Sequence, residues 1–197
     1  MVDRETFDLI RAKHGNYASW AVWAEPTAGP KSNIGDLSIL DPDRNPSLLG
    51  SLRSDVVMIG LNLSRFVPDK PFQNFHDKRS EGQDFKIRYA FAGTSYYGAY
   101  MTDVIKGVVE LQSRNLMRHL ASNQQMIAQN VGHLLEEFDD LHSAAPTLIA
   151  FGGDAFALAR HHIPRSRYSR LVRVTHYSHY LSKEAYRERV LAELAAG

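Results

Sequence analysis

The chain has 197 residues, of which 44% are hydrophobic and 23% charged, with a formal net charge of +1 and a pI near 8.0. It contains no cysteine, which excludes disulfides, thiolate zinc sites, iron–sulfur clusters and a cysteine nucleophile. The length predicts one domain over residues 1–197, in which residues 1–54 form an N-terminal extension packed on a core of residues 55–197.

The near-neutral charge argues neither for nor against a nucleic-acid partner, because a compact protein can gather its basic side chains on one face. No stretch approaches the ~20 apolar residues of a membrane helix, and the N-terminus lacks the apolar segment of a signal peptide. We therefore expect a cytoplasmic protein without a membrane partner, and we expect it to act as a monomer.

The first 54 residues are the least regular part of the chain. Asp3–Lys13 predicts a short helix that ends at Gly15, because Phe7, Leu9 and Ile10 supply a partial apolar face. A long loop region is expected after it, punctuated by Gly35, Pro42, Pro46 and Gly50.

The regular core begins at Asp55. Val56–Ile59 is a continuous apolar and mostly β-branched run that predicts a buried strand, and it ends in Gly60–Leu61–Asn62. A second short strand is expected at Ala99–Thr102, leading into a helix from about Asp103.

The C-terminal half repeats this pattern. Thr147–Phe151 predicts a strand that is followed by the Gly152–Gly153 turn and a helix through Ala155–Arg160. Leu171–Thr175 predicts a further strand that ends at His176.

Two longer helices are expected as well. The segment Asn123–Leu141 carries an apolar stripe and begins with Ser122 or Asn123 as its cap. Ser182 caps a second amphipathic helix that runs to about Ala195. Strands that alternate with helices predict an α/β fold of three layers, α/β/α, around a central, mostly parallel sheet. Ligands bind such sheets outside the carboxyl ends of the strands.

Two charged runs stand out in the second half of the chain, and we expect both to lie on solvated surface. The basic run comprises Arg160, His161, His162, Arg165, Arg167, Arg170 and Arg173. The acidic run comprises Glu136, Glu137, Asp139 and Asp140.

The strand ends carry the polar residues that bear on chemistry. Gly152–Gly153 before a helix suits a phosphate, but no P-loop and no GxGxxG is present, so no nucleotide cofactor is expected. Paired histidines raise the question of a metal, yet their spacings match no HExxH or His-x-His cluster with a nearby carboxylate. We therefore expect neither cofactor nor metal. The sequence contains no GxSxG elbow, which argues against a serine hydrolase.

Four segments in order resemble the uracil-DNA glycosylase superfamily, from about Asp55 to the C-terminus. VVMIGLNLS resembles its first motif, most closely that of the mismatch-specific branch, and HYSHYLSKEAYR resembles its second motif. AYMTDVIKG is similar to the segment that carries the base-reading Asn, and TLIAFGGDAFALA to the following strand, Gly turn and helix. The resemblance implies a glycosylase-like fold and a DNA partner, single- or double-stranded.

The resemblance also implies roles for individual residues. Asn62 matches the residue that positions the attacking water, and His176 matches the one that stabilises the departing base. Gly60 and Leu61 accompany Asn62 in the base pocket. A stacking aromatic is expected about 13 residues after Asn62, where Phe75 stands, with Phe91 as its rival.

The remaining implied roles concern the DNA strand. Ser64, Ser178 and the Gly152–Gly153 turn correspond to backbone contacts, and Tyr180 or Leu181 lies where a wedge would fill the vacated stack. Such an enzyme must extrude the nucleotide before its glycosidic bond is accessible.

Asp103 departs from the pattern, because it stands where the base-reading Asn is expected. An ionised Asp only accepts hydrogen bonds, so it suits a base edge with an amino group, or it behaves like Asn if burial keeps it protonated. Leu63, Ser64 and Tyr177 replace the Pro and Gly residues of the two motifs. We expect a glycosylase-like enzyme whose base is not simply uracil. The alternatives are a non-catalytic nucleic-acid-binding domain on the same fold and a small-molecule α/β hydrolase or transferase.

Overall fold

A computed structural model describes residues 2–197, which form one five-stranded sheet and seven α-helices. The strands stand in the order β1-β3-β2-β4-β5. All neighbours run parallel except β1, which pairs with β3 in the antiparallel sense. The strands are β1 (Ser19–Trp20), β2 (Arg53–Leu63), β3 (Ala99–Val109), β4 (Thr147–Phe151) and β5 (Arg170–Val174). The helices are α1 (Arg4–His14), α2 (Leu48–Ser51), α3 (Asp84–Phe91), α4 (Ser113–Ala121), α5 (Gln124–Asp140), α6 (Gly153–His162) and α7 (Lys183–Ala196).

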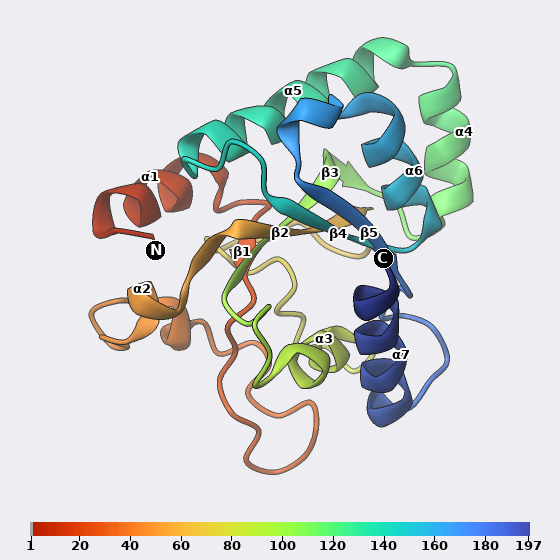
Figure 1. The fold of residues 1–197 in the computed structure, drawn as a ribbon. Helices are drawn as coiled ribbons and strands as arrows, with labels where there is room; N and C mark the ends of the chain where they lie inside the picture. Colours follow the sequence, from red (N-terminus) through yellow and green to blue (C-terminus); the bar gives the residue numbers. More distant parts are fainter. Residues whose placement is uncertain (1) are drawn as a thin grey trace.

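The predicted three-layer α/β architecture is confirmed (Figure 1). Helices α1, α4, α5 and α6 cover one face of the sheet, while α3 and α7 lie together on the other. Because strand side chains alternate between faces, Val57 and Ile59 join the core under the first group, and Val56 and Met58 join the core under α3 and α7.

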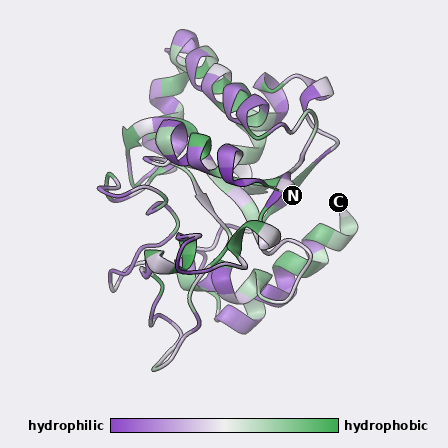
Figure 2. Ribbon diagram, turned by 90° about the vertical axis from the view of Figure 1, so that its left-hand side faces the viewer, coloured by the Kyte–Doolittle hydropathy of each residue, from purple (hydrophilic) through white to green (hydrophobic). Residues whose placement is uncertain are grey.

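Two helices begin at their predicted caps, Asn123 and Ser182, and Asp3, the first residue of the predicted N-terminal helix, acts as a third cap. Asp3, Asn123 and Ser182 each accept a backbone N–H from the first turn of α1, α5 and α7 respectively. Hydrophobic residues lie along one side of the long helices and hydrophilic residues along the other (Figure 2). In α5 the predicted stripe is buried or half-buried against the sheet, and in α7 Tyr186, Val190 and Leu194 are buried.

The helix predicted from Asp103 is wrong. Strand β3 continues from Ala99 to Val109, and the next helix, α4, begins only at Ser113. The β-branched residues Val104 and Ile105 favour a strand, and Gly107 adopts a φ of +71°, which a helix does not accept. Asp103 therefore lies inside a buried strand and not at a strand-to-helix turn.

Three elements have no predicted counterpart: β1, α3 and the four-residue helix α2, which lies at the end of the predicted loop region. Strand β1 adds the N-terminal segment to the edge of the sheet, so Trp20 becomes a fully buried core residue. Helix α3 lies within the long segment between β2 and β3, where Ile87, Ala90 and Phe91 pack under α7. Its eight residues are too few to show a clear helical period.

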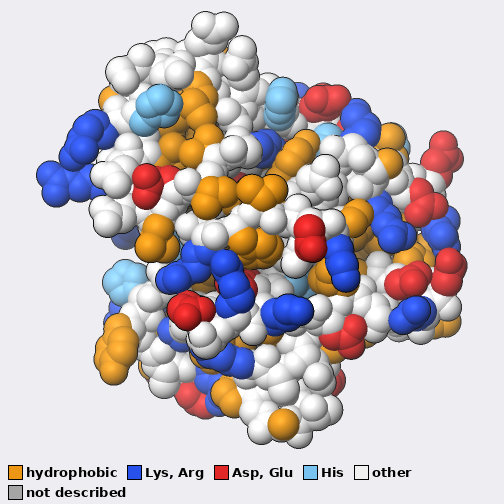
Figure 3. Space-filling model, turned by 180° about the vertical axis from the view of Figure 1, so that it is seen from behind, with side chains coloured by type: hydrophobic (Ala, Val, Ile, Leu, Met, Phe, Trp, Pro, Cys, Tyr) orange, Lys and Arg blue, Asp and Glu red, His pale blue; other side chains and the backbone are white. Residues whose placement is uncertain are grey.

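The expectation that both charged runs are solvated is wrong for Glu137, which is completely buried and pairs with Lys106. Arg167 and Asp139 connect the two runs through an ion pair. Seen from behind, basic side chains gather near the middle of the face with acidic ones among them (Figure 3). No helix in residues 2–197 has both the length and the apolar character needed to span a bilayer.

Candidate functional site

A pocket of about 540 Å³ opens at the carboxyl ends of the central strands. The sheet order explains its place, because the chain passes from β2 to β3 on one side and later to β4 on the other. Such a change of direction leaves a crevice between the connections that leave the sheet in opposite directions. The ends of β2, β4 and β5, the interior of β3 and the start of α6 all contribute to the wall.

The pocket brings together ten of the residues that the sequence analysis selected. They are Gly60, Leu61, Asn62, Ser64, Phe75, Asp103, Gly152, Gly153, His176 and Ser178. Phe91 is absent from the lining, because it is fully buried in the core against Phe151. Phe91 is a core residue, whereas Phe75, itself only 3% exposed, lines the pocket together with Phe66, Phe151 and Tyr177.

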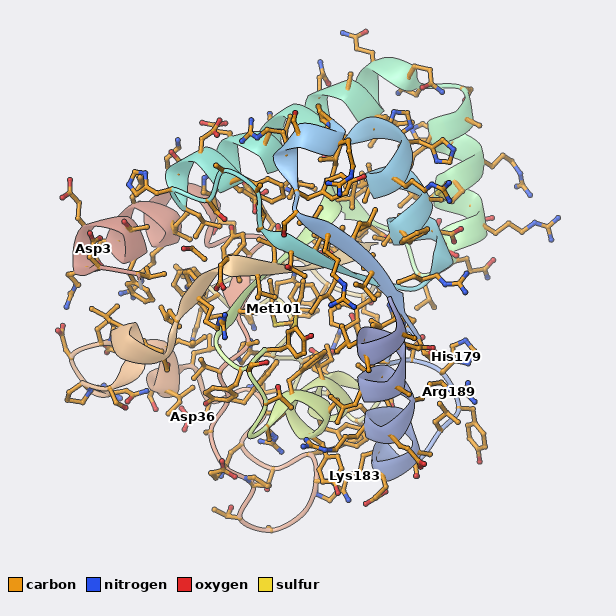
Figure 4. All side chains as sticks on the ribbon, in the orientation of Figure 1. Asp3, Asp36, Met101, His179, Lys183 and Arg189 are labelled. Atoms are coloured by element: carbon orange, nitrogen blue, oxygen red, sulfur yellow. The ribbon has the colours of Figure 1, made fainter. Side chains whose placement is uncertain are left out.

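The two wedge candidates differ in exposure. Tyr180 is fully exposed, whereas Leu181 is half-buried and packs on the core under α7. Both belong to the loop that joins β5 to α7. His179 lies on this loop and Lys183 at the beginning of α7 (Figure 4).

Asp103 forms part of the floor of the pocket and is only 3% exposed. Its Oδ2 accepts a hydrogen bond of 2.9 Å from the Asn74 side chain, whereas Oδ1 has no partner within residues 2–197. Burial raises the pKa of this carboxyl to about 7, although Asn74 and the Lys106 charge act in the opposite direction. The acid form, with its proton on Oδ1, would donate to a ligand, while the carboxylate would accept.

Gly60 makes room for this carboxyl. Gly60 and Asp103 are paired across β2 and β3, and a Cβ on Gly60 would lie 2.2 Å from Asp103 Oδ1. The same Cβ would lie 3.4 Å from the ring of Phe75. Because Gly60 has no side chain, the Asp103 carboxyl and the Phe75 ring can both pack against its backbone.

Asn74 and Trp23 hold the backbone of Phe75 in place. Phe75 has a φ of +62°, which is uncommon for a bulky residue. Its N–H donates to Asn74 Oδ1 at 3.0 Å, and its carbonyl accepts from Trp23 Nε1 at 3.0 Å. Asn74 Nδ2 also donates to Tyr17 O at 2.8 Å, so one amide aligns both Phe75 and Asp103. Sequence reasoning missed Asn74, because its partners are distant in the chain.

His176 is fixed in one tautomer. The backbone N–H of Ser178 donates to His176 Nδ1 at 3.1 Å, and because a backbone N–H can only donate, Nδ1 is the acceptor. In a neutral imidazole the proton then sits on Nε2, which has no protein partner in residues 2–197. Burial and the neighbouring His179 lower the pKa of His176 to about 4, so the ring is neutral at pH 7.

Tyr177 restricts the imidazole plane. Its ring stacks on His176 with centroids 4.2 Å apart and an interplanar angle of 23°, and it meets Phe151 edge-on at 5.5 Å. Thr175, just before this pair, donates through its N–H and hydroxyl to Glu193 of α7. The aromatic stack thus restricts the orientation of the His176 ring.

Asn62 joins the ends of two strands. Its Nδ2 donates to the carbonyl oxygens of Leu63, Val108 and Glu110, at 2.7, 3.2 and 3.0 Å. These acceptors determine which end of the amide faces them, so Oδ1 is the end left without a protein partner. Since Asn62 lines the pocket, Oδ1 can accept a hydrogen bond from a water there.

A second buried carboxyl, Asp84, was not expected from the sequence. It is 6% exposed, lines the pocket at the start of α3, and accepts from Asp77 N–H at 2.7 Å through Oδ2. Burial, together with the charges of Asp77 and Asp103, raises its pKa to about 7, although the hydrogen bond from Asp77 N–H acts in the opposite direction. Asp77 itself pairs with Arg79 through two hydrogen bonds.

Basic side chains contribute to the wall and rim. Arg65, Arg173 and His179 are exposed there, and Arg79 is half-buried. Within residues 2–197 no group of three or more His, Asp or Glu side chains has an arrangement that could hold a metal ion.

Comparisons of the chain with protein-family models, with curated proteins and with solved structures found no match. The chemistry of the pocket is therefore the basis for a functional conclusion.

Proposed function

We propose that the protein is a DNA glycosylase-like hydrolase that binds an extruded nucleobase in this pocket and hydrolyses its N-glycosidic bond. The observation that carries the proposal is the tautomer of His176, which leaves a neutral Nε2–H donor in the same pocket as Asp103 and Phe75. A neutral imidazole can donate to an acceptor on a base without adding a full positive charge.

The other lining residues suit a flat heterocycle. A base of any identity could stack on the Phe75 ring, because every base has a π-face. Asp103 Oδ1 provides one polar contact for the base edge. The two groups share the surface above Gly60, so a base stacked on Phe75 would meet the carboxyl at its edge.

The reaction breaks the bond between C1′ of the sugar and a nitrogen of the base. The electron pair leaves with the base, positive charge develops on the sugar, and a water adds to C1′. The added water loses a proton, which neutralises a base that leaves as an anion. Asn62 Oδ1 is suited to orient that water, because its amide is already held by three carbonyls. Donors that meet the developing charge in a dry pocket contribute a few kcal/mol to the rate.

The surroundings of the pocket suit a nucleic-acid strand. Arg65 and Arg173 are exposed near its rim and can approach phosphates. The Gly152–Gly153 turn places the beginning of α6 at the pocket, where free backbone N–H groups favour an anion. Tyr180 is exposed on the adjacent loop and is the better candidate for a wedge, since Leu181 is packed.

The experiment is release of bases from end-labelled oligonucleotides under single-turnover conditions, followed by cleavage at abasic sites. The panel contains uracil, hypoxanthine, xanthine and N-alkylated bases in single- and double-stranded form. We expect release of at least one base, and a loss of about 10²-fold or more in His176→Ala. His176→Gln, which keeps a side-chain N–H donor, should retain part of the activity. Absence of release from every substrate at high enzyme concentration would contradict the proposal.

A non-catalytic nucleic-acid-binding domain is the second candidate. The observation in its favour concerns Asn62. Its three hydrogen bonds to backbone carbonyls connect the ends of β2 and β3, which is a structural role that requires no catalysis. This candidate predicts binding of oligonucleotides that weakens steeply with salt, without base release. The release assay on the same protein sample separates the two.

A further inference from the structure

The floor of the pocket carries two buried carboxyls that share one arrangement. Asp103 and Asp84 are 3% and 6% exposed, and both line the cavity. Each has one oxygen held by a neutral donor, namely the Asn74 amide for Asp103 and the Asp77 N–H for Asp84. The second oxygen of each has no hydrogen-bond partner among residues 2–197.

Neighbouring cations are engaged elsewhere. Lys106 donates to the backbone carbonyl of Asp103 and forms its ion pair with Glu137, at 2.6 Å. Arg79 forms its ion pair with Asp77. In the part of the chain that the structure describes, neither Asp84 nor Asp103 forms a salt bridge, and burying a charge without such a partner is costly.

The negative charges of Asp84 and Asp103 affect the same neighbouring groups. Asp103 contributes to raising the pKa of Asp84, and both carboxyls contribute to raising the pKa of Tyr177 well above its usual value, although burial is the largest cause in each case. Tyr177 stacks on His176, so this potential extends to the donor side of the pocket.

This potential bears on the leaving group. A neutral base such as uracil leaves as an anion, which two nearby carboxylates would repel. A base with a fixed positive charge leaves as a neutral molecule, so the same carboxylates would favour its binding. The Phe75 ring adds to this preference, because the face of an aromatic ring attracts cations.

We propose that the substrates of this site are positively charged, N-alkylated nucleobases, which Asp84 and Asp103 bind as counterions while the base stacks on Phe75. This inference rests on the proposed hydrolase function. The C1′–N bond breaks heterolytically, and its electron pair neutralises the charged ring. Water adds to C1′ and loses one proton, so the products are the neutral alkylated base, an abasic sugar and a proton.

The test compares oligonucleotides that carry 7-methylguanine with matched ones that carry uracil or hypoxanthine. Cationic bases also depart spontaneously, so the quantity to compare is the enzymatic rate divided by the uncatalysed rate. We expect this ratio to be at least about tenfold larger for 7-methylguanine, as a preference of about 1.4 kcal/mol requires.

Two variants and one control locate the effect. Asp84→Asn and Asp103→Asn keep an oxygen for the existing donor, so they preserve the local hydrogen bonds. We expect each to reduce 7-methylguanine release about tenfold or more, and Asp103→Asn to improve release of uracil relative to it. Asp69→Asn, which changes an exposed carboxylate outside the pocket lining, should behave like the wild type.

The outcomes separate this inference from the proposed function. Equal or larger ratios for uracil and hypoxanthine would overturn the charge preference and leave the hydrolase function standing. If no base is released, calorimetric binding of 7-methylguanosine and guanosine decides. Tighter binding of 7-methylguanosine than of guanosine, lost in Asp103→Asn, would support the charge preference and refute the hydrolase function. Equal binding of the two nucleosides would refute both the charge preference and the hydrolase function.

Discussion

Gly60 and Asp103 stand opposite each other on β2 and β3, and the site depends on the missing side chain of the first. A Cβ at Gly60 would overlap with Asp103 Oδ1, whose carboxyl is buried and cannot move into solvent. The space above Gly60 is therefore a requirement of the pocket floor and not a consequence of backbone conformation.

Substitution of Gly60 by Ala should displace Asp103 and disturb the Phe75 ring. We expect a loss of about 1–3 kcal/mol in the free energy of unfolding, measured with urea, together with loss of base release. Gly132→Ala is the matched control, because its Cβ would meet nothing within 4 Å on helix α5. It should be neutral or stabilising by up to about 1 kcal/mol. Equal stability of Gly60→Ala and the wild type would refute this account of the floor.

The buried carboxyl of Asp103 should also appear in the pH dependence of stability. Its pKa is about 7 in the folded state against an ordinary 3.8, so the folded protein binds the proton more tightly. Stability is then lost as the pH rises from about 4 to about 7, by up to about 4 kcal/mol at roughly 1.4 kcal/mol per pKa unit.

Asp103→Asn removes this titration, so its stability relative to the wild type should rise across the same pH window and level off above it. Lys106, Glu137 and Asp84 lie around this carboxyl and are present in both proteins, so the difference between the two reports the titration of Asp103 together with its coupling to Asp84. Urea unfolding at pH 5, 6, 7 and 8 provides the measurement. A stability difference that is constant with pH would contradict the buried, raised pKa.

The residues of the site divide by how they could be found. Asn62 and His176 follow the apolar cores of their strands, and the sheet brings such positions together, so the sequence predicted that they share a region. Asn74 and Asp84 lie in the long segment between β2 and β3, and their roles depend on partners such as Tyr17 and Asp103. Nothing local in the chain marks those contacts.

At the scale of elements, apolar runs and caps predicted most helices and strands. Strand β1 and helices α2 and α3 had no predicted counterpart, and for β3 the sequence suggested a short strand and a helix after Asp103. Tertiary contacts override that choice, because β3 pairs with both β1 and β2, and Asn130 of α5 accepts a hydrogen bond from Lys106 N–H. The pairing partners of a strand lie far away in the sequence, so a local pattern does not contain them.

The junction between β3 and α5 depends on one buried ion pair. Lys106 and Glu137 are paired at 2.6 Å, and Tyr100 donates to the other oxygen of Glu137 at 2.7 Å. Lys106→Met leaves the Glu137 carboxylate buried and unpaired, so we expect it to destabilise the fold by about 3–5 kcal/mol in urea unfolding.

A second substitution tests the cause of that loss. Adding Glu137→Gln to Lys106→Met removes the unpaired charge and keeps an acceptor for Tyr100. The double variant should recover part of the stability. If Lys106→Met alone costs less than about 1 kcal/mol, the ion pair has no such role at this junction.

At the scale of the whole molecule, the sequence predicted the three layers, and the pocket opens at the carboxyl ends of the strands, where a ligand site was expected. The strand order was not predictable from local patterns, since it depends on which strands pair. The order β3-β2-β4 places Asp103, Asn62 and the Gly152–Gly153 turn around one pocket, and β5 brings His176 to its edge.

The central claim is that this pocket hydrolyses an N-glycosidic bond, and the most direct test follows the oxygen of the attacking water. Wild-type protein and an oligonucleotide that carries 7-methylguanine or uracil would be incubated in ¹⁸O-labelled water. The masses of both products would be determined by mass spectrometry after a single turnover. We expect a free base without label and an abasic strand with one ¹⁸O at C1′, measured before the label exchanges. An intact strand, or ¹⁸O in the base, would contradict the claim.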